Sequence, residues 1–212
     1  MYAQPSFRIS DANELKAFIA ARRFGTLVVS GPEGPVAAHL PMILQPGEGH
    51  GVLEGHVARS NPVAGLAAAG GRAIALFHGS DAYVTPSLYP SKREHGRTVP
   101  TWNYIAVEAG GALEAFSDPA ELRTHVAELT DLMESDAETP WAVSDAPDDY
   151  ISKMTGAITG LRLRIDRIEG MRKLSQNRPE PDRAGVLAGF SNSPHPSARD
   201  LADHMSKDTA SR

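Results

Sequence analysis

The sequence TLVVSGPEGPVAAHLPMILQPGEGHGVLEGHV, residues 26–57, alternates β-forming runs with short turns. Three runs rich in valine, leucine and isoleucine, at 26–30, 36–44 and 52–57, are predicted strands. Glycine and proline dominate the two segments between them, which is typical of tight turns. Three strands joined by such short turns favour an antiparallel arrangement.

Predicted helices and further strands surround this stretch. Residues 11–25 and 60–69 are expected to form helices, and 73–77 forms another apolar strand. The clearest helix is 118–134, where an aspartate caps the first turn, a proline follows it and apolar side chains recur on one face. Residues 161–165 alternate apolar and charged side chains, which indicates a strand with one solvated face.

The pattern predicts a mainly β fold with flanking helices (α+β), because several short strands occur without the regular βαβ alternation of a doubly wound sheet. The pair Gly110-Gly111 is expected to form a two-residue hairpin turn between two strands. We expect one domain over residues 1–190. Residues 191–212 are rich in Ser, Pro, His and Asp, and we expect a flexible tail there.

Composition narrows the class of protein. The chain has 212 residues, 41% of them hydrophobic, and 21 basic against 26 acidic side chains give a net charge of −5. It has no cysteine, which excludes disulfides, a thiolate nucleophile and cysteine-ligated metal or iron–sulfur sites. No segment has the roughly 18 apolar residues of a membrane span, and the N-terminus does not resemble a signal peptide, so a cytoplasmic protein is expected.

Common catalytic and metal-binding motifs are missing. The sequence contains no Walker A, G-x-S-x-G or H-E-x-x-H pattern. The glycines at 47–51 precede a strand, whereas a dinucleotide site needs a helix at that place. His39, His56 and His78 lie on or beside predicted strands but lack the spacing of a metal motif, so we expect no metal site.

Three stretches carry more polar chemistry than packing requires. Residues 55–62 end a strand with an arginine and helix-capping side chains, which suits a phosphate. Residues 98–104 offer aromatic rings and an amide, which suit a flat heterocycle. Residues 173–179 are polar at most positions and add two cations. Each stretch also has an ordinary structural interpretation, but together they suit a planar, phosphorylated cofactor.

At these residues the sequence resembles the FMN-binding negative transcriptional regulators of the PaiB type. The resemblance extends from Met1 to about Gly189. The matching blocks, in order, are Phe24-Gly25-Thr26-Leu27, His39-Leu40-Pro41, Gly55-His56-Val57-Ala58-Arg59, Ala82-Tyr83-Val84, Tyr89-Pro90-Ser91-Lys92, Val99-Pro100-Thr101-Trp102-Asn103-Tyr104, Pro140-Trp141 and Lys173-Leu174-Ser175-Gln176-Asn177-Arg178.

The resemblance implies an FMN-binding split barrel similar to that of pyridoxamine-phosphate oxidases, in a homodimer with flavin sites at the subunit interface. By position, the FMN-binding residues would be His39, Leu40 and Pro41 along the isoalloxazine ring; Gly55, His56, Val57, Ala58, Arg59, Ser60 and Asn61 at its polar edge and phosphate; Trp102 and Asn103 in the cleft wall; and Lys173, Ser175, Gln176 and Arg178 closing the cleft.

Two departures from the family pattern bear on the cofactor. Leu88 stands where the family often has an aromatic residue, and Met171-Arg172 replaces an expected lysine–aromatic pair. Loss of an aromatic ring weakens stacking, although the planar guanidinium of Arg172 can stack or contact a phosphate.

The resemblance leaves three hypotheses about function. The first is an FMN-dependent regulator, and the second is a flavin-dependent oxidoreductase, with Tyr104, His56 and His39 as proton-handling candidates. The third is a haem or small-ligand binder. DNA binding is implied by family analogy alone, since the sequence shows no helix-turn-helix. Its candidate basic stripe is Arg162, Arg164, Arg167 and Arg172, for which the simpler interpretation is the solvated face of a strand.

Overall fold

The computed structural model describes residues 1–210, which divide into two compact units. Unit 1 comprises residues 1–11, 78–107 and the chain from 169 onward, and unit 2 comprises residues 12–77 and 108–168. The long strands β5, β6 and β7 contribute residues to both units. Residues 1–190, for which one domain is expected, contribute to both units.

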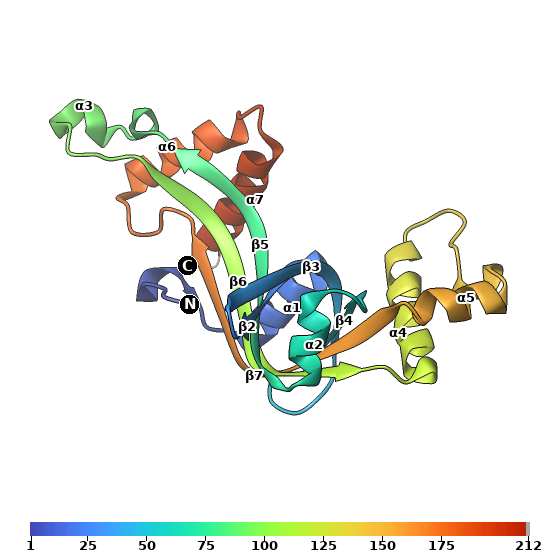
Figure 1. The fold of residues 1–212 in the computed structure, drawn as a ribbon. Coiled ribbons are helices and arrows are strands. Elements are labelled where there is room, and N and C mark those ends of the chain that lie inside the picture. The colour runs from blue at the N-terminus through green and yellow to red at the C-terminus, as the bar shows by residue number, and fades with distance from the viewer. Residues whose placement is uncertain (211–212) are drawn as a thin grey trace. The chain divides into compact units, whose positions relative to one another are not determined.

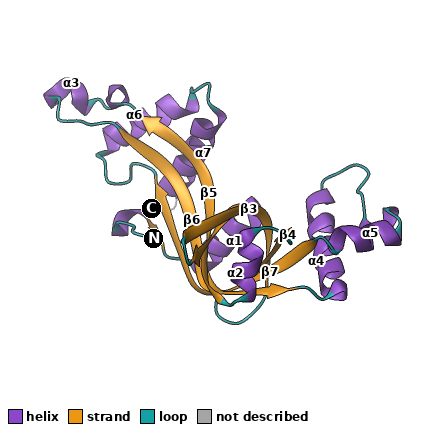
Figure 2. Cartoon of the chain, in the orientation of Figure 1, coloured by secondary structure: helices purple, strands orange, loops and turns teal. Residues whose placement is uncertain are grey.

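The chain forms strands and helices, with β2, β3 and β4 following one another directly and α6 and α7 at the C-terminal end (Figures 1 and 2). The strands are β1 (Arg8–Ile9), β2 (Phe24–Gly31), β3 (Gly34–Gln45), β4 (Val52–Ala58), β5 (Gly71–Val84), β6 (Thr101–Phe116) and β7 (Ile158–Lys173). The α-helices are α1 (Ala12–Arg22), α2 (Pro62–Ala68), α3 (Ser91–His95), α4 (Pro119–Glu134), α5 (Asp148–Thr155), α6 (Glu180–Ser191) and α7 (Pro196–Ala210). Three 3-10 turns are η1 (Pro5–Phe7), η2 (Pro86–Leu88) and η3 (Val143–Asp145). Among the helices of residues 1–210, none is long and apolar enough to cross a membrane.

The strands of unit 2 close into a barrel. The sheet order is β1-β7-β4-β3-β2-β5-β6, and β7 also pairs with β6, which joins the ends of the six strands from β7 to β6. Neighbouring strands run antiparallel, with Thr26 opposite His39, Met42 opposite Gly55, and Gly55 opposite Leu161. The predicted strands of residues 26–57 and their turns are confirmed, and so is the mainly β fold with flanking helices.

Alternation of side chains along the strands fills the barrel. Leu27, Leu53, Phe77, Leu113 and Leu163 are each at most 2% exposed, and they come from five different strands. Because successive side chains of a strand point to opposite faces, the residues between them face outward. These buried side chains form an apolar core that stabilises the five strands together, and Ala3, Phe7 and Met171 form a further buried cluster in unit 1.

The glycine pair of β6 does not form the expected hairpin turn. Gly110 and Gly111 lie within one unbroken strand. A Cβ atom on Gly111 would lie 1.7 Å from the carbonyl oxygen of Arg164 on β7. The pair instead permits close approach of two strands, because only glycine leaves room for the neighbouring backbone.

The C-terminal residues are ordered, contrary to the expected flexible tail. Residues 196–210 form α7, which packs on α6 in unit 1 (Figure 1). Ala198, Leu201, Ala202 and Met205 are each at most 4% exposed. Their spacing of three and four residues forms a helical apolar face, which the polar composition of the segment obscured. Residues 211–212 lie outside the described part of the chain.

Candidate functional site

In unit 2, the expected ring-lining residues lie on β3 beside β4. Leu40 is 3% exposed and belongs to the core, whereas His39 is exposed and its Nδ1 lies 3.0 Å from Thr26 Oγ1. A Cβ atom on Gly55 would lie 2.9 Å from the carbonyl oxygen of Pro41. Gly55 therefore keeps β3 and β4 close, and Leu40 stabilises the barrel through its side chain.

The second expected segment connects β4 to α2. Val57 is buried, while Ala58, Arg59 and Ser60 are exposed. The side-chain oxygen of Asn61 accepts a hydrogen bond of 2.9 Å from the backbone N–H of Val63, so this amide caps α2. The exposed polar groups at this junction are thus the guanidinium of Arg59 and the hydroxyl of Ser60.

Arg59 lines a cavity of about 310 Å³ that the sequence did not predict. Its other polar lining residues include Arg123 of α4 and the hydroxyl residues Ser117 and Ser152, and none of its described lining residues is acidic. Arg123 also pairs with Asp148 at 2.6 Å. A cavity lined by two arginines and hydroxyl donors, with no acidic lining residue, favours an anion such as a phosphate, and Arg59 carries most of this preference because Asp148 offsets the charge of Arg123.

His56 of β4 contacts a residue that the sequence analysis missed. Its Nδ1 lies 3.1 Å from Nε2 of His125 on α4, which is 2% exposed. Burial, with a smaller contribution from His56, lowers the pKa of His125 to about 4, and burial also lowers the pKa of His56. Both imidazoles are therefore neutral at pH 7 and can share one proton between these nitrogens. The signal for His125 was its position between Leu122 and Leu129 on the buried face of α4.

In unit 1, the remaining predicted residues come together around the turn after β7. Asn103 and Ser175 are buried, and the amide Nδ2 of Asn103 donates to Ser175 Oγ at 3.0 Å. Ser175 has a φ of 63°, an uncommon left-handed conformation for this residue type. Gln176 fixes the same turn, since its side chain accepts from the N–H of Leu174 and donates to the carbonyl of Arg172.

Two cations flank this turn. Lys173 Nζ donates to the carbonyl oxygen of Trp102 at 2.7 Å and to the hydroxyl of Thr101. The guanidinium of Arg178 lies over the ring of Tyr89, 4.8 Å from its centroid. Burial, with a smaller contribution from Arg178, lowers the pKa of Lys173. Neither cation pairs with a carboxylate among residues 1–210, so this turn is a second place where an anion is favoured.

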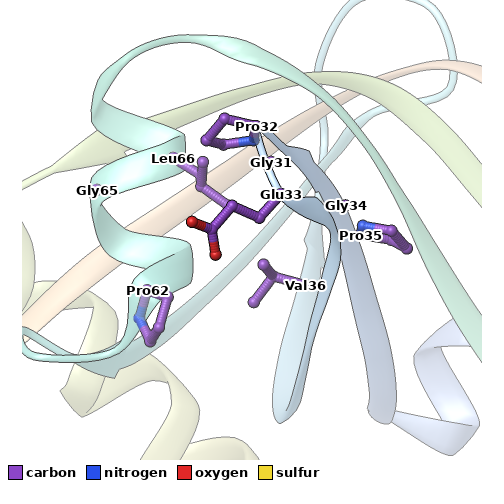
Figure 3. Close-up of a pocket in the computed structure, with 9 residues that line it drawn as sticks. All are labelled: Gly31, Pro32, Glu33, Gly34, Pro35, Val36, Pro62, Gly65 and Leu66. Carbon is purple, nitrogen blue, oxygen red and sulfur yellow. The ribbon is translucent and has the colours of Figure 1, made fainter.

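Two larger cavities lie elsewhere. In unit 2, the turn between β2 and β3 and the helix α2 enclose about 510 Å³, with the Glu33 carboxylate directed into the space (Figure 3). Its walls are mostly proline, glycine and aliphatic side chains, and none of the predicted site residues lines it. In unit 1, a cavity of about 690 Å³ includes Trp102 among its lining residues.

The predicted residues thus form two groups. Those from His39 to Asn61 lie in unit 2, and those from Trp102 to Arg178 lie in unit 1. Each group contains partly exposed cationic side chains and a rigid backbone segment. The chemistry available is binding of an anion by guanidinium or ammonium groups, and stacking on the exposed ring of Trp102.

The barrel is shared with known flavoproteins. The structure aligns with the FAD and heme binding protein from Mycobacterium smegmatis at a TM-score of 0.59 and 16% identity, covering 92% of this chain and 96% of that one. It aligns with the flavocytochrome Anf3 from Azotobacter vinelandii at a TM-score of 0.59 and 13% identity, covering 86% and 78%. The chain is therefore a split-barrel protein of the pyridoxamine-phosphate-oxidase-like fold.

Sequence comparison defines the family. The family model described as "Putative FMN-binding domain" matches residues 1–167, and the chain belongs to this family. The protease synthase and sporulation protein PAI 2 of Bacillus subtilis is 29% identical over 205 residues, which is 97% of this chain and 96% of that protein. The uncharacterized protein AN0679 of Emericella nidulans is 33% identical over 201 residues, covering 79% and 80%. The resemblance to the PaiB type is confirmed.

Proposed function

We propose that this protein is a cytoplasmic FMN-binding regulator of the PaiB type. The observation that carries the flavin assignment is the cavity lined by Arg59 and Arg123, which has no acidic lining residue and lies inside the part of the chain that the family model matches. The phosphate of FMN is a dianion, which the guanidinium of Arg59 can bind and orient, while Arg123, whose charge is offset by Asp148, adds hydrogen-bond donors.

The two units offer separate groups of residues for this cofactor. In unit 2, Arg59 and Arg123 would hold the phosphate, with the hydroxyls of Ser117 and Ser152 as further donors. In unit 1, Lys173 and Arg178 supply positive charge and the exposed indole of Trp102 supplies a stacking surface, so this group is the alternative place for the phosphate or for a polar edge of the ring. When bound, FMN supplies transfer of a hydride or of single electrons.

The regulatory part of the proposal rests on the relative PAI 2, whose name associates it with protease synthesis and sporulation. In this hypothesis the occupancy or redox state of the flavin biases a homodimer towards a protein partner or a gene target. A solved protein of the same fold, from Mycobacterium smegmatis, is named as an FAD and heme binding protein, so the choice of FMN over FAD is part of what must be tested.

Direct contact with DNA has weak support in the charge distribution. Arg162 pairs with Glu54, Arg164 with Glu114 and Arg167 with Glu108, each at 3.0 Å or less. These pairs offset the charge of most of the candidate basic stripe, so it offers little to a phosphate backbone.

The first experiment is a titration of the purified protein with FMN, and separately with FAD, followed by quenching of flavin fluorescence. Saturation near one FMN per chain supports the proposal. Absence of saturable flavin binding contradicts it.

Two further measurements on the FMN-loaded protein decide between the regulator and the oxidoreductase. They are binding of a labelled promoter fragment at several salt concentrations, and oxidation of NADH or NADPH. Catalytic turnover without DNA or partner effects would favour the oxidoreductase.

A further inference from the structure

The largest of the described cavities lies within unit 1 and has an aromatic wall. It encloses about 690 Å³ between the end of β5, the start of β6 and the connection from α6 to α7. Tyr83 and Trp102 form this wall, with ring centroids 5.9 Å apart in an edge-to-face arrangement. Both rings are about half exposed, at 51% and 50%, so a ligand could bury a large apolar area against them.

The charge of this cavity differs from that of the anion sites. Asp81 is an acidic lining residue, and no lysine or arginine is among the described lining residues. The backbone of Asp81 is held by Ser197, whose hydroxyl accepts from the N–H at 2.9 Å and donates to the carbonyl at 2.7 Å. The carboxylate itself has no hydrogen bond or ion pair within residues 1–210, so it is available to a ligand.

These features together select one class of ligand. A cavity lined by a carboxylate, a tyrosine ring and a tryptophan ring attracts a positive charge, since the quadrupole of each ring is negative over its face. Phe190 and Leu88 extend the apolar lining, which suits a hydrocarbon body attached to that charge. An anion would meet the Asp81 carboxylate with no lysine or arginine of the lining to compensate its charge, and His195 is the lining residue that carries an imidazole.

We propose that this cavity binds a small organic cation, namely an amine or quaternary ammonium group on an apolar body, with Asp81, Tyr83 and Trp102 as its recognition residues. The site shares Trp102 with the residues named for FMN, but its other recognition residues, Asp81 and Tyr83, have no part in that proposal. It is built partly from residues 189–198, which lie beyond the part of the chain that the family model matches. Its preference for positive charge is also opposite to that of a phosphate site.

The test uses the fluorescence of Trp102. The chain has two tryptophans, and the variant Trp141→Phe leaves Trp102 as the sole reporter. Benzyltrimethylammonium is expected to change this emission saturably, whereas 3-phenylpropionate, an anion of similar size, binds at least tenfold more weakly. Asp81→Asn should weaken the cation about threefold to tenfold, which corresponds to the loss of one partly exposed charge interaction.

The control is Glu33→Gln, which removes a carboxylate from the cavity of unit 2 in Figure 3 and should leave the affinity for the cation unchanged. Tyr83→Phe keeps the ring and should bind the cation with nearly unchanged affinity, whereas Tyr83→Ala should bind the cation clearly more weakly.

Equal binding of cation and anion, or an unchanged affinity in Asp81→Asn, would overturn the proposal. Displacement of the cation by saturating FMN would assign the cavity to the flavin instead. Failure of FMN to bind at all would leave the cation site standing.

Discussion

At the scale of single residues, the glycines, which lack a Cβ atom, shape the barrel as much as charged side chains shape its cavities. A Cβ atom on Gly111 would lie 1.7 Å from the carbonyl oxygen of Arg164 on β7, and a Cβ atom on Gly160 would lie 2.2 Å from the ring of Phe116. Arg59 shows the opposite case, because its charged group lines a cavity without an acidic neighbour. The glycines determine how the barrel closes, and the arginine determines what charge the cavity can accept.

The close approach of β6 and β7 predicts a large effect of one methyl group. We expect Gly111→Ala to lower the free energy of unfolding by about 3 kcal/mol or more, since the carbonyl of Arg164 cannot rotate away as a side chain could. Gly65→Ala is the matched control. It lies in α2 with open space around its Cβ position, and alanine there should stabilise the protein by up to about 1 kcal/mol. Chemical denaturation measures both, and equal stability of the two variants would refute the explanation.

The phosphate assignment predicts a loss of affinity without a loss of fold. Removing a charged hydrogen-bond partner costs about 1.5 to 3 kcal/mol, so Arg59→Ala should weaken FMN roughly tenfold to a hundredfold. Arg72→Ala, which removes an exposed arginine paired with Asp166, should leave FMN affinity unchanged. Fluorescence titration and a melting curve check both variants. An unchanged affinity in Arg59→Ala would move the phosphate to Lys173 and Arg178.

At the scale of elements, helices dock through a few buried groups. The helix α4 begins at the Asp118 cap, whose carboxylate accepts from the N–H groups of Ala120 and Glu121 at 3.0 Å. It then places His125 against His56 of β4, so a polar contact joins helix and barrel. The helix α7 instead docks by an apolar face, and the guanidinium of Arg183 on α6 donates to the carbonyl of Met205 at 3.2 Å.

The buried histidine pair predicts a pH-dependent stability. Unfolded imidazoles take up a proton near pH 6.5, but folded His125 does so only near pH 4. The unfolded state therefore binds more protons between these values, and the free energy of unfolding should fall by on the order of 3 kcal/mol as the pH drops from 6.5 to 4. Arg162 opposes protonation of His125 and Glu54 favours it, but burial dominates.

The variant His125→Gln should flatten this dependence, because glutamine does not titrate. His39→Gln changes an exposed histidine and should retain the slope of the wild-type protein. Urea denaturation at several pH values between 4 and 7.5 gives the comparison. A wild-type slope in His125→Gln would mean that other groups control the acid response.

The docking of α7 predicts that its apolar face contributes to stability. Leu201 has no exposed surface, and Leu201→Ala should cost about 2 to 5 kcal/mol through lost burial and a residual cavity. Asp203→Ala, on the exposed face of the same helix, should change the stability by less than about 0.5 kcal/mol. Thermal melting distinguishes the two, and a neutral Leu201→Ala would restore the hypothesis of an unattached tail.

At the scale of the whole molecule, surface composition bears on assembly. The net charge of −5 gives the chain as a whole no electrostatic attraction to duplex DNA. Several large apolar side chains are nevertheless exposed, including Phe24, Val99, Trp102, Met133 and Tyr150 at 50 to 65%. Large exposed apolar side chains are common at protein interfaces.

We therefore expect a homodimer in solution, as the PaiB-type resemblance implied. Light scattering after gel filtration should give twice the mass of the chain at micromolar concentration. The mass should persist in high salt, since apolar burial is not screened by ions. A monomer at all accessible concentrations would contradict this expectation. It would also exclude flavin sites at a subunit interface.

The sequence alone determined the strands of residues 26–57, their glycine-rich turns, the helix after Asp118 and the family. These features depend on local periodicity and capping, which neighbouring residues encode. The family blocks also pointed to the turn of Ser175 and to its buried neighbour Asn103, although not to the hydrogen bond between them.

Only the tertiary structure decided the features that depend on residues distant in sequence. The Gly110-Gly111 pair has the composition of a hairpin turn, but the backbone of β7 requires glycine there within a strand. His125 contacts a histidine 69 positions away, and Arg59 and Arg123 meet at one cavity through packing that no local pattern encodes. The polar composition of residues 196–210 concealed the apolar face of α7 in the sequence, because burial depends on which side of a helix packs against a neighbouring element.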